Sequence, residues 1–145
     1  MKGDGFVLDT NVLISAALSS GSAPARLTLW VIANARLIFA DETFDELRTR
    51  LWRPKFDRYL SIERRNQILH DLSAVADWVE IGEVASPIAS RDADDDMFLR
   101  VAIAGDARWI VSGDKDLLEL HGLAGVPILT PAAILQLPGF PASGT

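Results

Sequence analysis

Three aspartates stand just after short apolar runs that have the composition of buried β-strands. Asp9 follows Phe6–Leu8, Asp41 follows Leu37–Ala40, and Asp114 follows Trp109–Ser112. In open α/β sheets, ligands bind outside the carboxyl ends of the parallel strands. A carboxylate buried at such a place costs free energy unless a cation compensates its charge. The pattern therefore indicates a cation site at one edge of a sheet.

Each candidate acid also has an ordinary structural interpretation. Asp9 can act as the N-cap of the helix predicted to follow it. Glu46 borders the apolar face of a predicted helix over Glu42–Trp52, where a solvated acid is the simpler interpretation. The run Arg91–Asp96 holds four aspartates, which either lie in a solvated loop or crowd together before a helix. Adjacent carboxylates repel one another, so four of them exceed what a helix dipole needs.

The residue types available restrict the metal that these acids could bind. The chain has no cysteine and only two histidines, His70 and His121, which excludes a thiolate zinc site and a histidine-rich metal site. Sites made only of oxygen ligands suit Mg²⁺ and Mn²⁺. Mg²⁺ binds through a few carboxylates together with substrate phosphates. The chemistry that this favours is metal-assisted hydrolysis of a phosphodiester bond.

The composition is that of an ordinary globular protein. The chain has 145 residues, of which 49% are hydrophobic and 23% are charged. Its net charge of −6 argues against a protein that binds nucleic acid mainly through overall positive charge. The charge does not argue against a protein that binds phosphates through metal ions. No signal peptide is recognisable, and no apolar stretch approaches the roughly 20 residues needed to span a bilayer. We therefore expect a cytoplasmic protein.

Predicted strands and helices alternate along the chain. The strands are expected at Phe6–Leu8, Leu37–Phe39, Trp78–Ile81, Trp109–Val111 and Pro127–Leu129. The helices are expected at Asn11–Leu18, Pro24–Ala35, Glu42–Trp52 with Asp41 as N-cap, Ser61–Ala76 with Ser61 as N-cap, Asp95–Ala104 and Lys115–Leu120, with a last turn from Pro131. This alternation predicts an α/β fold with a parallel sheet between two layers of helices. We expect one domain over residues 1–137 and a flexible tail over residues 138–145.

Four blocks of the chain match a known family in order and spacing. They are Val7–Ser15 (VLDTNVLIS), Glu46, Arg91–Leu99 (RDADDDMFL) and Ile110–Leu118 (IVSGDKDLL). Together they resemble the PIN-domain nucleases, and the branch they resemble most is the toxin ribonucleases of bacterial toxin–antitoxin pairs (VapC-like). The resemblance implies a PIN-like three-layer sandwich with a central five-stranded parallel sheet. It also implies Mg²⁺- or Mn²⁺-dependent cleavage of single-stranded RNA, a homodimer, and a small antitoxin protein as partner.

The resemblance also assigns roles to individual residues. It implies that the catalytic, metal-binding acids are Asp9, Glu46, Asp95 and Asp114. Asp95 is chosen within its run because Ala102 then falls where the family has a small residue. The family branch usually has asparagine where this chain has Asp96, so Asp96 remains an alternative ligand, as does Asp116. Three polar residues match positions that orient the carboxylates, namely Thr10, Asn11 and Ser112.

Positive charge is concentrated between Arg48 and Arg65. This segment holds seven basic and two acidic residues, a net charge of +5, which leaves −11 for the rest of the chain. Trp52 and Tyr59 lie within it, and exposed aromatic rings beside cations can stack on unpaired bases. We expect the segment to guide RNA toward the acids, through Arg48, Arg50, Arg53 and Lys55. The alternative is that these arginines are ordinary solvated residues and that both aromatic rings make core or dimer contacts.

Two other functions fit part of the pattern. A haloacid-dehalogenase-like phosphatase also has an aspartate at the end of its first strand, but it needs a second aspartate two residues later, where this chain has Asn11. A PIN-like domain could also be a non-catalytic binding or scaffold module whose acids only cap helices. Candidate acids in all four blocks favour the nuclease. Titration with Mn²⁺ separates the two, because a scaffold needs no stoichiometric metal.

Overall fold

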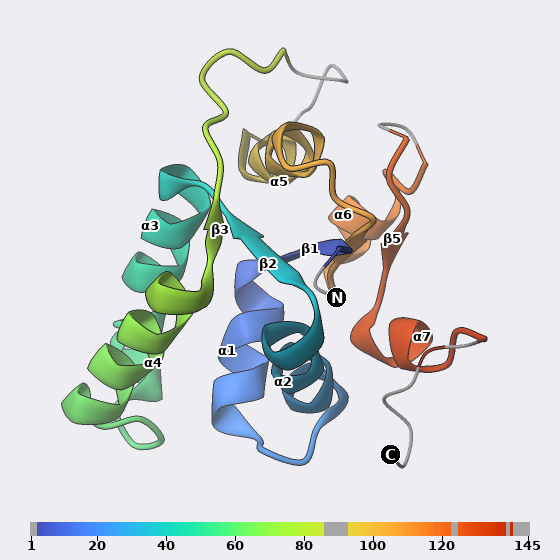
Figure 1. The fold of residues 1–145 in the computed structure, drawn as a ribbon. Coiled ribbons are helices and arrows are strands. Elements are labelled where there is room, and N and C mark those ends of the chain that lie inside the picture. The colour runs from blue at the N-terminus through green and yellow to red at the C-terminus, as the bar shows by residue number, and fades with distance from the viewer. Residues whose placement is uncertain (1–2, 86–92, 123–124, 139, 141–145) are drawn as a thin grey trace.

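A sheet of five parallel strands forms the centre of the computed structural model, in the order β3-β2-β1-β4-β5 (Figure 1). The structure describes residues 3–85, 93–122, 125–138 and 140. The strands are β1 (Gly5–Leu8), β2 (Arg36–Phe39), β3 (Asp77–Trp78), β4 (Trp109–Val111) and β5 (Ile128–Leu129). Chain order reverses between β1 and β4, which is where open α/β sheets bind their ligands.

Helices cover both faces of the sheet, as the alternating pattern predicted. They are α1 (Thr10–Leu18), α2 (Ala23–Asn34), α3 (Asp41–Leu51), the short 3₁₀ helix η1 (Pro54–Phe56), α4 (Ile62–Val75), α5 (Ala93–Ala104), α6 (Lys115–Leu118) and α7 (Pro131–Leu135). The five-stranded parallel sheet between helix layers confirms the predicted PIN-like α/β fold. Among the described residues, no helix is long and apolar enough to cross a membrane.

Alternation of side chains along the strands divides the core into two parts. Phe6 and Leu8 of β1 belong to one apolar cluster, with residues of α1, α2, α3 and α7. Val7 faces the other way and belongs to a second cluster, with Leu99 and Ala102 of α5. Figure 1 shows α5 well apart from α1 and α2. The carboxyl end of β1 is thus fixed from both sides.

Most predicted element boundaries differ by only a residue or two from the observed ones. Ser61 caps α4 as expected, since its hydroxyl accepts a hydrogen bond from the Arg64 N–H at 3.0 Å. The expectation for Asp41 was wrong: Ala40 is the N-cap of α3, and Asp41 is the first helical residue. At that end of α3, the Thr43 hydroxyl is 3.0 Å from the Ala40 N–H and accepts its hydrogen bond. Thr43, the third helical residue, thus bonds back to the N-cap residue, and Ala40 itself makes no side-chain capping hydrogen bond.

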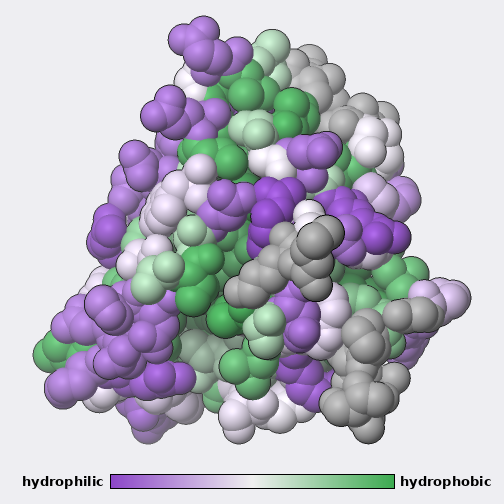
Figure 2. All heavy atoms as spheres, viewed as in Figure 1, coloured by the Kyte–Doolittle hydropathy of each residue, from purple (hydrophilic) through white to green (hydrophobic). Residues whose placement is uncertain are grey.

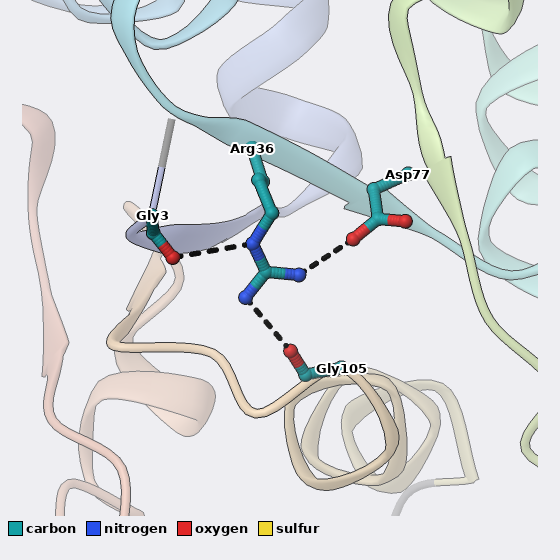
Figure 3. A network of polar contacts seen from close by, with 4 residues as sticks. All are labelled: Gly3, Arg36, Asp77 and Gly105. Atoms are coloured by element: carbon teal, nitrogen blue, oxygen red, sulfur yellow. Dashed lines mark hydrogen bonds and ion pairs between the residues drawn. The ribbon is translucent and has the colours of Figure 1, made fainter. Parts of the chain in front are cut away.

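The Arg36 side chain contacts three separate segments of the chain at the amino-terminal edge of the sheet (Figure 3). Its guanidinium lies 2.5 Å from the Asp77 carboxylate at the start of β3. It also donates to the carbonyl oxygens of Gly3 at 3.3 Å and Gly105 at 3.1 Å. A Cβ on Gly105 would lie 2.8 Å from the Ile38 side chain, so only glycine fits at this position. The network holds the amino-terminal edge of the sheet, opposite the predicted site.

Near the C-terminus, Phe140 packs on Trp30 with ring centroids 4.4 Å apart. Trp30 in turn contacts Phe6 of β1 at 6.0 Å between centroids. Residues 139 and 141–145 lie outside the described residues, so the flexible tail over residues 138–145 stays a prediction, as does the boundary of the domain at residue 137.

Candidate active site

Asp9 ends β1 and caps α1 at the same time. Its Oδ1 accepts a hydrogen bond from the Val12 N–H at 2.9 Å, and its Oδ2 accepts one from the Ser112 hydroxyl. The side chain is only 4% exposed. Burial raises the pKa of Asp9 above its ordinary value of 3.8, the charges of Asp114 and Glu46 raise it further, and the two hydrogen bonds oppose the shift. Asp9 is therefore a helix cap and also a buried acid facing other acids.

Glu46 lies on α3 and is held by two neighbours. The Thr10 hydroxyl donates to Glu46 Oε2 at 2.5 Å, which joins the start of α1 to α3. Arg50 follows one helical turn later, and its guanidinium lies 2.8 Å from Glu46 Oε1. The Glu46 side chain is 12% exposed, so it is not the solvated helix acid of the simpler interpretation. Its position is fixed by partners on both oxygens.

Asp114 lies just beyond the end of β4. Its backbone N–H donates to the Ser112 hydroxyl at 2.9 Å, and the same hydroxyl donates to Asp9. Asp114 Oδ1 accepts from the Asp116 N–H at 3.0 Å, so Asp114 caps the short helix α6. Asp116 itself is exposed. Ser112 thus positions the acids that follow β1 and β4.

Asp95 and Asp96 occupy different environments in the first turns of α5. Asp95 is 8% exposed, whereas Asp96 is half-buried. Only Asp95 of the two lines the cavity at the carboxyl ends of β1 and β4. Asp92 lies outside the described residues. The structure therefore favours Asp95 over Asp96 as the acid of this run that faces the site.

One cavity of about 60 Å³ brings the four predicted acids together. It is lined by Asp9, Thr10, Asn11, Glu46, Arg50, Asp95, Phe98, Asp114 and Leu117. The acids come from the end of β1, from α3, from α5 and from the loop after β4. Asp41 is exposed and is not among the residues that line this cavity, although only Ala40 separates it from the end of β2. The arrangement fits the oxygen-only donor set that the sequence predicted.

Comparison with known proteins identifies the family. The family model described as PIN domain matches residues 5–116, which include Asp9, Glu46, Asp95 and Asp114. This chain belongs to the PIN domain family. It is also 32% identical over 121 residues to an uncharacterized protein of Methanocaldococcus jannaschii, an alignment that covers 79% of this chain and 74% of that protein. PIN domains are generally nucleases and typically use divalent metals.

The donor set of this PIN domain suits such a metal chemically. Carboxylate oxygens are the ligands that Mg²⁺ and Mn²⁺ prefer, and the cavity contains no histidine. Within the described ranges, no three His, Cys, Asp or Glu side chains stand close enough together to hold one ion. The four carboxylates therefore share a cavity without converging on a single point. Asp9, Glu46 and Asp114 each accept hydrogen bonds, and Glu46 also forms an ion pair with Arg50.

The predicted orienting residues fall into two groups. Thr10 and Ser112 are buried, and each hydroxyl donates to a carboxylate of the cavity. Asn11 is exposed and lines the cavity, but in the described part of the chain its amide makes no hydrogen bond to a carboxylate. Thr10 and Ser112 therefore orient the acids, and Asn11 is available for other contacts.

The four residues predicted to bind RNA differ in their exposure and in their contacts. Arg48 lies 2.6 Å from Asp45 on the exposed side of α3, and Arg50 binds Glu46 inside the cavity. Arg53 and Lys55 are exposed near η1. Figure 2 shows hydrophilic residues along the edge of the molecule formed by α3 and α4, which η1 connects. Arg53 and Lys55 are thus placed on the surface, whereas Arg50 belongs to the acidic cavity.

Two arginines have roles that sequence reasoning missed. Arg50 was predicted to contact RNA, and the ion pair with Glu46 could have been inferred from their spacing of four residues on one helix. Arg65 is only 3% exposed. Its guanidinium lies 3.0 Å from Asp57 and 5.2 Å from the centre of the Trp52 ring. Arg65 and Trp52 are therefore structural, while Tyr59 is exposed at 66%.

Proposed function

We propose that this PIN domain is an endoribonuclease that hydrolyses phosphodiester bonds in single-stranded RNA and depends on Mg²⁺ or Mn²⁺. The observation that carries the proposal is the cavity lined by Asp9, Glu46, Asp95 and Asp114. Four acids from separate segments of the chain lie around one cavity at the switch point of a parallel sheet. Membership of the PIN domain family supports nuclease chemistry at that place.

The acids that line the cavity would hold the divalent cation after their side chains move closer together, because among the described residues no three of them stand close enough to hold one ion. The cation would supply charge neutralisation at the phosphate and a more acidic water. Ser112 and Thr10 hold the carboxylates of Asp9 and Glu46 in fixed orientations. Such outer contacts set the affinity of a metal site. Phe98 and Leu117 form the apolar part of the cavity lining.

A preference for single strands is supported by the surface around η1. Tyr59 is exposed at 66%, and the cations Arg53, Lys55 and Arg58 are exposed near it in sequence. Unpaired bases can stack on such a ring, whereas the bases inside a duplex are already stacked on their neighbours and cannot reach it. Paired cations such as Arg48 and Arg65 add less to this surface than the sequence suggested.

The proposal is tested by cleavage of an end-labelled pool of single-stranded RNA. We expect cutting with Mg²⁺ or Mn²⁺, none with EDTA, and a loss of at least about a hundredfold in Asp95→Asn, since the substituted acid belongs to the metal set. Asp96→Asn is the matched control and keeps most of the activity. No cutting by a protein that binds Mn²⁺ would restrict the proposal to a selective RNA target. No cutting together with no Mn²⁺ binding would replace it by the scaffold function.

We further propose that the enzyme is the toxin of a type II toxin–antitoxin pair, acting in the cytoplasm as a homodimer silenced by a small antitoxin protein. This proposal rests on the resemblance of the four sequence blocks to that branch. Induced expression in a bacterial host tests it. Growth should stop with the natural chain and continue with Asp95→Asn at equal protein levels. Equal growth of the two strains would contradict the toxin role and leave the ribonuclease chemistry untouched.

A further inference from the structure

A second hollow adjoins the acidic cavity on the side of β4. It has a volume of about 530 Å³. Asn11 and Asp114 line both spaces, so the two lie on either side of these side chains. The second hollow also includes Ser15 of α1, Gly113 and Lys115. We call it the Lys115 groove and define it by Asn11, Ser15, Gly113, Asp114 and Lys115.

Three side chains of the Lys115 groove can donate hydrogen bonds to a ligand. Asn11, Ser15 and Lys115 are all exposed. As far as the described residues go, none of the three side chains has a hydrogen-bond or ion-pair partner. Around Gly113 there is open space where a Cβ would stand, so the backbone is accessible there as well. These groups suit a ligand that offers many oxygen acceptors.

The charge of the groove differs from that of the cavity beside it. Among the described residues, the cavity is lined by four acids and one cation, Arg50, which is bound to Glu46. The groove contains Asp114 and one cation, Lys115, which has no such partner. An anionic polymer that places one phosphate at the acids therefore meets the ammonium group of Lys115 next to them. Lysine binds phosphate as a compact point charge with three donors.

We propose that the Lys115 groove is the subsite for the nucleotide adjoining the scissile phosphodiester. Lys115 binds the phosphate of that nucleotide, and Asn11 and Ser15 hydrogen-bond to its sugar or base. This inference rests on the proposed ribonuclease function. It assigns the exposed Asn11 a contact with substrate, in place of the role in orienting carboxylates that the sequence suggested. It also places substrate contacts on α6 and α1 in addition to the surface around η1.

Binding of a fluorescent single-stranded RNA to Lys115→Gln tests the inference. Both this variant and its reference carry Asp95→Asn, so that the RNA stays intact in the presence of Mg²⁺. We expect Kd to rise about twofold to fivefold at 0.1 M salt, as for loss of one exposed ion pair. The slope of log K against log salt should fall by about 0.7, the value for one phosphate contact on a single strand. Lys115→Arg should restore most of both quantities.

Arg108→Gln is the matched control. It removes the same charge, but Arg108 precedes β4 and lies at the opposite edge of the sheet, paired with Asp4 at 3.1 Å. An unchanged Kd and slope in Lys115→Gln, or equal losses in Arg108→Gln, would overturn the inference. Cleavage by the chain with Asp95 intact is measured in parallel. Cleavage without a Lys115 effect overturns the groove alone, whereas absence of both cleavage and Mn²⁺ binding overturns the proposed function together with the groove.

A crosslink gives the position of the nucleotide directly. The chain has no cysteine, so Ser15→Cys provides a single thiol for a short photoreactive group. We expect crosslinks within one or two nucleotides of the cut, whereas Ser73→Cys on α4 should crosslink weakly and without preference. Crosslinks from Ser15→Cys that scatter along the RNA would contradict the assignment of the groove.

Discussion

The hydroxyl of Ser112 donates a hydrogen bond to Oδ2 of Asp9 and accepts one from the backbone N–H of Asp114. One buried serine after β4 thus positions two acids that lie 105 residues apart in the chain, across the switch point of the sheet. The acids of β1 and β4 are held as one unit before any ligand arrives.

Ser112→Ala should weaken metal binding without unfolding the protein. The change removes the donor to Asp9 and the acceptor of the Asp114 N–H, which costs about 1–3 kcal/mol of stability because a buried partner is lost. The affinity for Mn²⁺ should fall about tenfold to a hundredfold. Calorimetric titration measures the affinity. Ser73→Ala, whose hydroxyl bonds only to a carbonyl of its own helix, should leave it unchanged. Equal affinities in both variants would mean that Ser112 does not orient the acids.

Asp9→Asn should raise the melting temperature of the metal-free protein at pH 7. Asparagine keeps the cap of α1, because it is as good an N-cap as aspartate. Since burial raises the pKa of Asp9, the folded state favours the protonated form. Stability from this group is therefore present at low pH and lost as the pH rises through the raised pKa. A gain on the order of 1 kcal/mol corresponds to about 3 °C.

The pH dependence provides the control for this prediction. The advantage of Asp9→Asn should shrink as the pH is lowered toward 3.8, the ordinary pKa of aspartate, where Asp9 becomes protonated in both states. Melting curves of both proteins at several pH values with EDTA measure this difference. An advantage that stays constant with pH would show that the charge of Asp9 is not its cause.

Arg50→Gln should tighten metal binding. Arg50 is a cation bound to Glu46 inside the cavity, so it competes with a divalent cation for the same carboxylate and repels it. We expect the Kd for Mn²⁺ to fall about threefold to tenfold, given partial screening of charges near the surface. The matched control is Arg48→Gln, two residues away, whose partner is the exposed Asp45. Weaker metal binding in Arg50→Gln would instead mean that Arg50 holds Glu46 in position for the metal.

Arg36→Met should destabilise the fold but spare the site. The change removes the contacts to Asp77, Gly3 and Gly105 at the amino-terminal edge of the sheet (Figure 3). Loss of these contacts should cost about 1–3 kcal/mol in urea unfolding. Arg108→Met loses only an exposed ion pair and ring contact and should cost less than about 1 kcal/mol. Metal affinity of the folded Arg36→Met protein should equal that of the natural chain.

The strand ends were predictable from the sequence because the sheet is parallel and buried. Apolar runs of three or four residues ending on Asp9 and near Asp114 mark β1 and β4, and parallel strands bring such ends to one edge. Glu46 and Asp95 were not predictable in this way, since a helix pattern alone leaves solvated acids as the simpler interpretation. Only the resemblance to the PIN-domain nucleases singled them out, and the structure then placed both in the cavity.

Other contacts depend on tertiary packing that no local pattern reveals. Arg65 lies in a basic run, yet it is buried against Trp52 and paired with Asp57 from the loop before α4. Asp41 comes after a strand as Asp9 does, but it is the first residue of α3 and is exposed. At that helix end, the Thr43 hydroxyl accepts the hydrogen bond from the Ala40 N–H. Charge counting along the chain therefore overestimated the positive surface, because it could not distinguish paired arginines from free ones.

Whether the acidic cavity binds a metal ion can be measured by titrating the metal-free protein with Mn²⁺. The titration compares the natural chain with variants at two neighbouring residues. Asp95 lines the cavity and Asp96 does not, although they are adjacent and carry the same charge. We expect stoichiometric binding in the natural chain and in Asp96→Asn, and a large loss of affinity in Asp95→Asn. Binding that is absent from the natural chain, or equal in Asp95→Asn, would contradict the assignment of this cavity as a metal-dependent nuclease site.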